Sequence, residues 1–205
     1  MRRNSFLLAL AVAVAGCSPV APPAAPSPAP QAIAGALPAA SLTVSTLAGA
    51  GAGRVDGPLA QARFYRPHAL AYGADGTLYV ADSGNDRLRK VAPDGAVSTL
   101  ETSVTLEHPT GLAVAPDGTL YVTELLHNQV FKVTPDGAVS ALAGASEAGF
   151  ADGAAGAARF YDPIGLALGP DGSLYVADSG NDRIRKIAQA GLTCHASSRF
   201  RLALS

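Results

Sequence analysis

The sequence predicts an all-β protein made of one structural unit repeated three times. The segment Tyr79–Arg87 returns residue for residue as Tyr175–Arg183, and a degenerate copy begins at Tyr121. Asp-Gly turns, many of them preceded by Pro, separate short apolar runs, and such turns join antiparallel strands because Gly supplies a positive φ. The 22 Gly and 15 Pro residues also favour short segments over long helices.

Each unit is predicted to hold four strands, which we call a, b, c and d in chain order. In the first unit they are His68–Tyr72, Thr77–Ala81, Arg87–Val91 and Ala96–Leu100. The b strand has no polar residue in alternation, so both faces of its sheet need cover. Four strands in a unit of about 40 residues are typical of β-propeller blades, whose sheets stack face to face. We therefore expect a partial β-propeller of three four-stranded blades, with repeats at about 66–100, 108–143 and 162–188.

The second unit carries a family resemblance. Pro109, Gly111–Val114, Pro116–Gly118 and Tyr121-Val122, followed by a strand like Arg87–Val91, resemble the NHL repeat. Units one and three are similar to that consensus through Tyr-Val-Ala-Asp-Ser-Gly-Asn-Asp-Arg, whereas unit two departs from it at Glu124–Gln129. The resemblance covers about residues 42–188 and implies a closed ring of about six blades, twice what this stretch holds.

The first residues have the layout of a secretory signal. Arg2 and Arg3 precede the apolar run Phe6–Ala15, which is shorter than the roughly 20 residues of a membrane span. Residues Val14–Cys17 resemble the lipobox of bacterial lipoproteins, and this resemblance implies that Cys17 becomes the mature N-terminus and carries the lipid. The alternative is an ordinary signal peptide with an incidental cysteine.

A spacer follows the expected signal peptide, which spans residues 1–16. Residues 17–41 are rich in Ala and Pro, and dense Pro favours extended geometry over a packed core. We expect a lipidated, disordered linker that holds the blades off a membrane. The protein is then exported and lipid-anchored in the bacterial cell envelope, facing the periplasm from the outer membrane in a Gram-negative cell.

The ends of the repeat region do not complete a blade. Residues 42–48 match the d strand Ala138–Leu142, so we predict a closing d-type strand there, while the last predicted strand, Arg183–Ile187, is of c type. Residues 189–205 form an aberrant tail in which repeat periodicity and acidic residues both stop. A gene truncated or frameshifted after about Ala188 would explain this. The alternative is a head-to-tail homodimer that completes a six-blade ring, each d strand finishing the other copy's last blade.

Three acidic residues occupy equivalent positions at the ends of the b strands: Asp82, Glu124 and Asp178. The b–c and d–a connections of a propeller share one face, so these carboxylates lie beside the long loops. They suit a hard cation such as Ca²⁺. We favour the alternative that each accepts hydrogen bonds from the backbone of its own turn. No other cofactor and no metal site is expected.

Neighbouring polar residues extend this candidate site. The equivalent residues Arg66, His108 and Asp162 precede the inner strands at the channel mouth, and His68 begins the first of those strands. These residues are expected either to contact a polar ligand or to remain in contact with solvent at the rim of the channel. The candidate ligand-binding residues are Asp82, Asn85, Arg87, Glu124, Asp178, Asn181, Arg183, His68 and His108.

Composition narrows the functional classes. The 15 basic and 16 acidic residues give a net charge of -1, which argues against nucleic-acid binding. Having only two cysteines excludes a protein held together by a disulfide scaffold.

No catalysis is expected, because no general base occurs in the inner strands Ala69–Tyr72, Gly111–Val114 and Gly165–Leu168. We expect a module that binds a protein, peptide or glycan, or acts as a scaffold. The alternative is a remnant or half of a metal-dependent propeller hydrolase or lyase, similar to lactonases or amidating lyases.

Overall fold

The computed structural model describes residues 43–188 of the chain. The expected signal peptide, Cys17, the linker and the tail 189–205 lie outside the described residues. The chain divides into two compact units, Met1–Val44 and Ser45–Ser205, and every described strand belongs to the second. In the described part, no helix has the length and apolar character of a membrane span.

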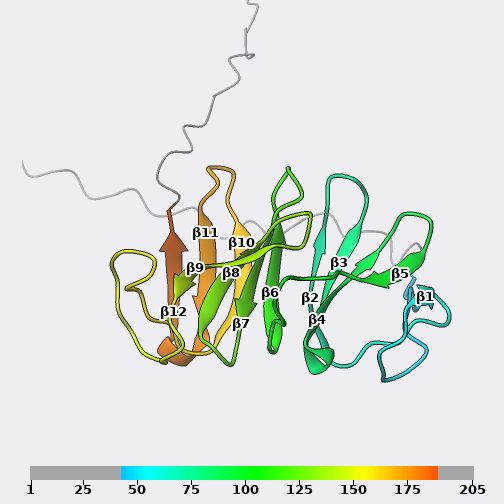
Figure 1. Ribbon diagram of the computed structural model, residues 1–205, viewed down its shortest axis with the longest axis horizontal. Helices are drawn as coiled ribbons and strands as arrows, with labels where there is room; N and C mark the ends of the chain where they lie inside the picture. Colours follow the sequence, from blue (N-terminus) through cyan, green and yellow to red (C-terminus); the bar gives the residue numbers. More distant parts are fainter. Residues whose placement is uncertain (1–42, 189–205) are drawn as a thin grey trace, which may run out of the picture. The chain divides into compact units, whose positions relative to one another are not determined.

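Three antiparallel sheets follow one another in chain order (Figure 1), and we call them blades one, two and three. Blade one holds β1 (Gly57–Pro58), β2 (Pro67–Tyr72), β3 (Leu78–Asp82), β4 (Arg87–Val91) and β5 (Ala96–Thr99), in the order β1-β5-β4-β3-β2. Blade two holds β6 (Pro109–Val114), β7 (Leu120–Glu124), β8 (Gln129–Val133) and β9 (Val139–Gly144). Blade three holds β10 (Pro163–Leu168), β11 (Leu174–Asp178) and β12 (Arg183–Ile187). The predicted all-β partial propeller is confirmed, although among the described residues only blade two has the expected four strands, whereas blade one has five and blade three has three.

The turns are stabilised by the residues that predicted them. Asp75 Oδ1 accepts the backbone N–H of Thr77 at 3.0 Å and Oδ2 accepts its hydroxyl at 2.9 Å. Gly76 takes a positive φ of 85°, which lets the chain reverse between β2 and β3. The backbone hydrogen bond from Thr77 lowers the pKa of Asp75, because it stabilises the charged carboxylate.

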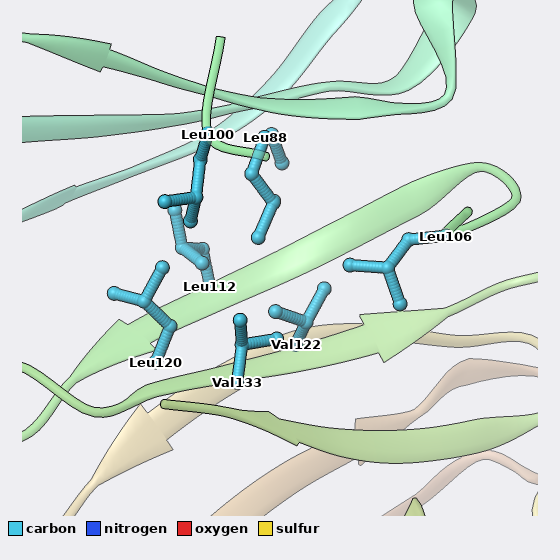
Figure 2. Packing of buried hydrophobic residues seen from close by; sticks show 8 residues of the cluster. Leu88, Leu100, Leu106, Leu112, Leu120, Val122 and Val133 are labelled. Carbon is cyan, nitrogen blue, oxygen red and sulfur yellow. The ribbon is translucent and has the colours of Figure 1, made fainter. Parts of the chain in front are cut away.

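The core lies between the blades, as two-sided apolar strands require. Leu88 and Leu100 of blade one meet Leu112, Leu120 and Val122 of blade two (Figure 2). A second cluster joins blades two and three and is formed by Val130, Ala143, Ala158, Phe160 and Val176. A fully buried Leu or Val side chain contributes about 1.5–3 kcal/mol relative to an exposed one. Blade stacking therefore contributes several kcal/mol to stability, on the order of 1.5–3 for each fully buried side chain.

Blades two and three approach so closely that one position tolerates no side chain. A Cβ added at Gly111 would lie 2.5 Å from the carbonyl oxygen of Ile164 in blade three and 2.5 Å from Thr123 Oγ1. Real Cβ atoms do not approach so near, so the glycine permits this contact.

Two features between the strands differ from expectation. Short 3₁₀ helices, η2 (Ser83–Asn85) and η3 (Ser179–Asn181), connect the b and c strands of blades one and three. The closing strand predicted for residues 42–48 is not formed in the single chain: Thr43–Leu47 has no regular secondary structure. A strand needs a neighbour for its backbone groups, and within one chain the open edge β12 belongs to blade three, which matches the expectation that only another copy's last blade could take this strand.

Candidate functional site

The predicted acidic residue of blade one is the centre of a buried hydrogen-bond cluster. Asp82 Oδ1 accepts the backbone N–H of Tyr65 at 2.7 Å. Its Oδ2 accepts Asn85 Nδ2 at 2.7 Å and Arg89 Nη1 at 3.0 Å. The side chains of Asp82 and Arg89 are both fully buried, so each charge depends on the other for compensation.

Arg89 also fastens the long loop that precedes blade one. Its Nη2 donates to Asp56 Oδ1 at 2.5 Å and to the carbonyl of Val55 at 2.8 Å, and Nη1 donates to the carbonyl of Arg63 at 3.0 Å. The guanidinium carbon lies 4.9 Å from the centre of the Phe64 ring, a cation–π distance. We call Asp56, Asp82, Asn85 and Arg89 the clasp of blade one.

Blade three repeats the clasp with Asp152, Asp178, Asn181 and Arg185. Asp178 accepts the N–H of Tyr161 at 2.8 Å, and its other oxygen accepts Asn181 Nδ2 and Arg185 Nη1, each at 2.9 Å. Arg185 Nη2 reaches Asp152 at 2.7 Å. The long insertions before units one and three therefore complete these two clasps.

These contacts change the interpretation of two predicted site residues. We expected Asp82 and Asp178 to bind their own turns or a cation. From their own turns they accept only the side-chain amide of Asn85 or Asn181, and their other hydrogen bonds come from the backbone of a residue 17 positions earlier and from a buried arginine. In the described part of the chain, no three His, Cys, Asp or Glu residues gather as a metal site would require.

Blade two has a different arrangement. Phe131 stands where the other blades have arginine, and Glu124 accepts the N–H of Glu107 through Oε1. Glu124 is buried, and burial raises the pKa of its carboxyl group. His127 Nδ1 lies 3.3 Å from Glu124 Oε2 and its side chain is 44% exposed, so this pair reaches the surface.

A row of residues with left-handed backbone links the blades on the same face. Asp86 Oδ1 of blade one accepts the N–H of His108 at 2.9 Å and lies 3.2 Å from its ring Nδ1. Asn128 Oδ1 of blade two accepts the N–H of Asp162, just before blade three, at 3.0 Å. We call Asp86–His108 and Asn128–Asp162 the junction pairs. The equivalent residues at the two ends are Arg66 and Asp182, both exposed.

An exposed polar cleft lies beside the first junction pair. Its volume is about 210 Å³ and it is lined by Asp86, Arg87, Leu100, Glu101, Thr102 and Thr105. Part of its wall, Glu101, Thr102 and Thr105, belongs to the connection before β6, which lacks the long insertion found before β2 and β10. Of the predicted residues, Arg87 lines this cleft, and His108 lies beside it through its hydrogen bond to Asp86.

The remaining candidates do not join this cleft. Arg183, the counterpart of Arg87, packs its guanidinium carbon 4.1 Å from the Phe150 ring centre. Asn85 and Asn181 tie their turns to the carbonyls of Gly53 and Gly149, and His68 is exposed at the start of β2. Sequence reasoning missed Asp86 and Glu101, although the short connection before unit two marks their location.

The stacked sheets with shared core clusters define part of a β-propeller. Residues 94–188 match the family described as the teneurin NHL domain, and residues 64–91 match the NHL repeat. These matches support the assignment of the chain as an NHL-repeat protein, and the predicted repeat type is confirmed. No curated protein matches the chain.

Two solved structures with a TM-score of 0.53 support the propeller fold. An auxiliary nutrient binding protein from Bacteroides thetaiotaomicron matches with a TM-score of 0.53 and 19% identity, over 62% of this chain and 38% of that one. A putative phosphatase from the same organism has a TM-score of 0.53 and 21% identity, over 63% and 36%. A streptogramin B lyase has a TM-score of 0.46 and 21% identity, over 60% and 37%. The chain spans less than half the length of these proteins, and at such identities the likeness concerns the fold alone.

Proposed function

We propose that this protein is an exported, lipid-anchored binding or scaffold module that recognises a protein, peptide or glycan through the polar cleft at the junction of blades one and two. The observation that carries this proposal is the composition of the cleft wall. Arg87 supplies hydrogen-bond donors, and Asp86 and Glu101 supply acceptors, within a volume of about 210 Å³. Convergent donors and acceptors of this kind suit the hydroxyl groups of a sugar or the amides of a peptide.

The electrostatics of the face support binding by this cleft over binding by the clasps. The carboxylates of Asp82 and Asp178 are fully buried and hold the arginines and loops of their own blades, so an incoming ligand would compete with the fold. Asp86 and Arg87 are only partly buried. A ligand in the cleft would therefore reach Arg87 and Glu101 without dismantling either clasp.

Ligand binding is tested with a glycan array and a peptide library, followed by calorimetry on each hit. We expect Arg87→Ala to weaken binding at least tenfold, because a charge-assisted hydrogen bond is worth about 1.5–3 kcal/mol. Arg183→Ala is the matched control, since Arg183 occupies the same repeat position but packs on Phe150. Equal losses in the two variants, or no change in either, would refute the assignment of this cleft.

The expected anchor is tested separately at Cys17. If Cys17 carries the lipid, the chain should incorporate labelled palmitate and fractionate with membranes. Cys17→Ser should abolish both properties, because several acyl chains are needed for stable anchoring. Membrane fractionation and labelling that persist in Cys17→Ser would contradict the lipoprotein assignment.

A further inference from the structure

Both ends of the blade stack expose surfaces that are interior surfaces elsewhere in the same molecule. Leu70 lies on the face of β2 turned away from blade two and is 63% exposed, whereas its repeat counterpart Leu112 is 5% exposed. Ile184 of blade three is 74% exposed, whereas its counterpart Leu88 is 1% exposed. The sequence thus places apolar residues at both ends as if another blade covered them.

Both ends of the blade stack also carry polar residues at the positions of the junction pairs. The internal junctions pair Asp86 with His108 and Asn128 with Asp162. At the ends, the same positions hold Asp182 on blade three and Arg66 on blade one, which have opposite charges. Within residues 43–188, neither of these two side chains forms a hydrogen bond or an ion pair. Blade three of one molecule and blade one of another are therefore charge-complementary at this position.

A strand is available for the unfinished blade. Residues 44–47 read Val-Ser-Thr-Leu and repeat Val97–Leu100, the d-strand sequence of blade one. In blade one, Thr99 donates its N–H and its hydroxyl to the clasp residue Asp56, at 3.1 and 3.3 Å. Blade three has no d strand among its described residues, and its clasp residue Asp152 is 79% exposed.

We propose that a second copy of this chain docks head to tail against the open end of blade three. Its Thr43–Leu47 segment adds to β12 as the fourth strand, with Thr46 donating to Asp152 as Thr99 donates to Asp56. Arg66 of that copy pairs with Asp182. Two such junctions between two copies close a ring of six blades with twofold symmetry.

Chain connectivity favours a second copy over the same chain. Each d strand directly precedes the inner strand of the next blade, and the connection from Leu47 to Pro67 is close in length to that from Leu142 to Pro163. The segment lies at the open end of blade one, because Thr46 and Leu47 line one hollow with Leu70 of β2. Just after the segment, Ala50 donates its N–H to the carbonyl of Ala62 at 2.8 Å. Strand β12 lies beyond blade two, so the segment fits a neighbour's β12 and not its own.

The contact area is sufficient for a stable dimer. A face of four strands by five residues covers about 320 Å², from the spacing and rise of β-strands. A closed dimer buries four such faces, about 1,300 Å², which lies within the range of about 1,200–2,000 Å² for stable interfaces. The added strand contributes main-chain hydrogen bonds beyond this area.

The test is the mass in solution, measured by sedimentation on the full chain carrying Cys17→Ser so that no lipid contributes. We expect a folded dimer. Arg66→Asp should raise the dimer dissociation constant about tenfold or more, because the substitution places a second carboxylate opposite Asp182. Arg66→Asp combined with Asp182→Asn recreates the Asn128–Asp162 pair and should restore the dissociation constant to within about threefold.

The outcomes separate an intermolecular contact from a local effect. Arg66 and Asp182 stand at opposite ends of one chain, so only a contact between copies can couple them. Asp162 occupies the equivalent position of blade three with a φ of 48°, so the backbone at Arg66 accommodates the change to aspartate. A folded monomer at all concentrations, an Arg66→Asp variant that dimerises normally, or a double variant without recovery would overturn the proposal.

Discussion

Removing the carboxylate of Asp82 should destabilise the protein severely. Asp82→Ala deletes the acceptor of three hydrogen bonds, from the Tyr65 backbone, the Asn85 amide and the Arg89 guanidinium. Loss of one partner from a buried ion pair costs about 3–5 kcal/mol. Asp56 still contacts the guanidinium at 2.5 Å, so the lower end applies, and the unpaired Tyr65 N–H adds about 1 kcal/mol. We therefore expect a loss of about 4 kcal/mol in the free energy of unfolding.

Urea denaturation followed by circular dichroism measures this loss. With a slope of about 2 kcal/mol per molar urea, the midpoint should fall by about 2 M. Asp75→Ala, which removes an exposed turn carboxylate, is the control and should cost about 1 kcal/mol or less. Arg89→Phe should partly rescue Asp82→Ala, because Phe131 fills the same position in blade two and no cation is then left buried. A cost below about 1 kcal/mol for Asp82→Ala, or strict additivity of the two changes, would refute the reasoning.

Two further predictions concern the pH dependence and the blade junction. Burial raises the pKa of Glu124 above its ordinary value of 4.5 in the folded protein. The native protein should therefore lose stability relative to Glu124→Gln as the pH rises through 4.5 toward the higher folded pKa. Urea unfolding of both proteins between pH 4 and about 8 measures this difference in stability, and a difference that is independent of pH would contradict the prediction. Gly111→Ala should cost about 1–3 kcal/mol, because the new Cβ would lie 2.5 Å from the Ile164 carbonyl oxygen, whereas Gly165→Ala meets only Ala177 Cβ at 3.2 Å. Thermal unfolding compares these two variants, and equal losses would show that the close approach of the blades is not limiting.

Much of the fold could be predicted from the sequence, because each strand is marked by a repeated local signal. The Asp-Gly turn before β3 and the verbatim Tyr-Val-Ala-Asp segments locate strands within a residue or two of their observed ends. The predicted strand at 42–48 is the exception. Its residues match a d strand, but a strand forms only beside a partner, and local sequence does not supply one.

The candidate site could be predicted only in part. Repeat positions identified Asp82, Asp178, Arg87 and His108 as members of one face, and the structure places them there. The sequence does not single out Arg89 as the partner of Asp82, because Arg89 lies among other basic residues of its c strand. Its second contact, Asp56, lies 33 residues away in the sequence, and local patterns carry no information on such contacts. The cleft beside Arg87 lies where the short connection before unit two forms part of the wall. Such a cleft depends on how segments pack in space, which a local sequence pattern does not reveal.

The central claim is that every blade needs a neighbour on both faces, and disulfide formation between two chains tests it most directly. Register in blade one pairs Lys90 with Ser98, so the same register would place Lys186 opposite Ser45 of a second copy. Opposed residues have Cβ atoms about 4.5–5.5 Å apart, close enough for a disulfide after small adjustment. Two chains, one with Ser45→Cys and one with Lys186→Cys, both carrying Cys17→Ser and Cys194→Ser, are mixed and oxidised. We expect a disulfide-linked dimer that forms only when both variants are present, because each cysteine faces the other variant's cysteine. Folded chains that stay unlinked after mixing and oxidation would contradict the claim.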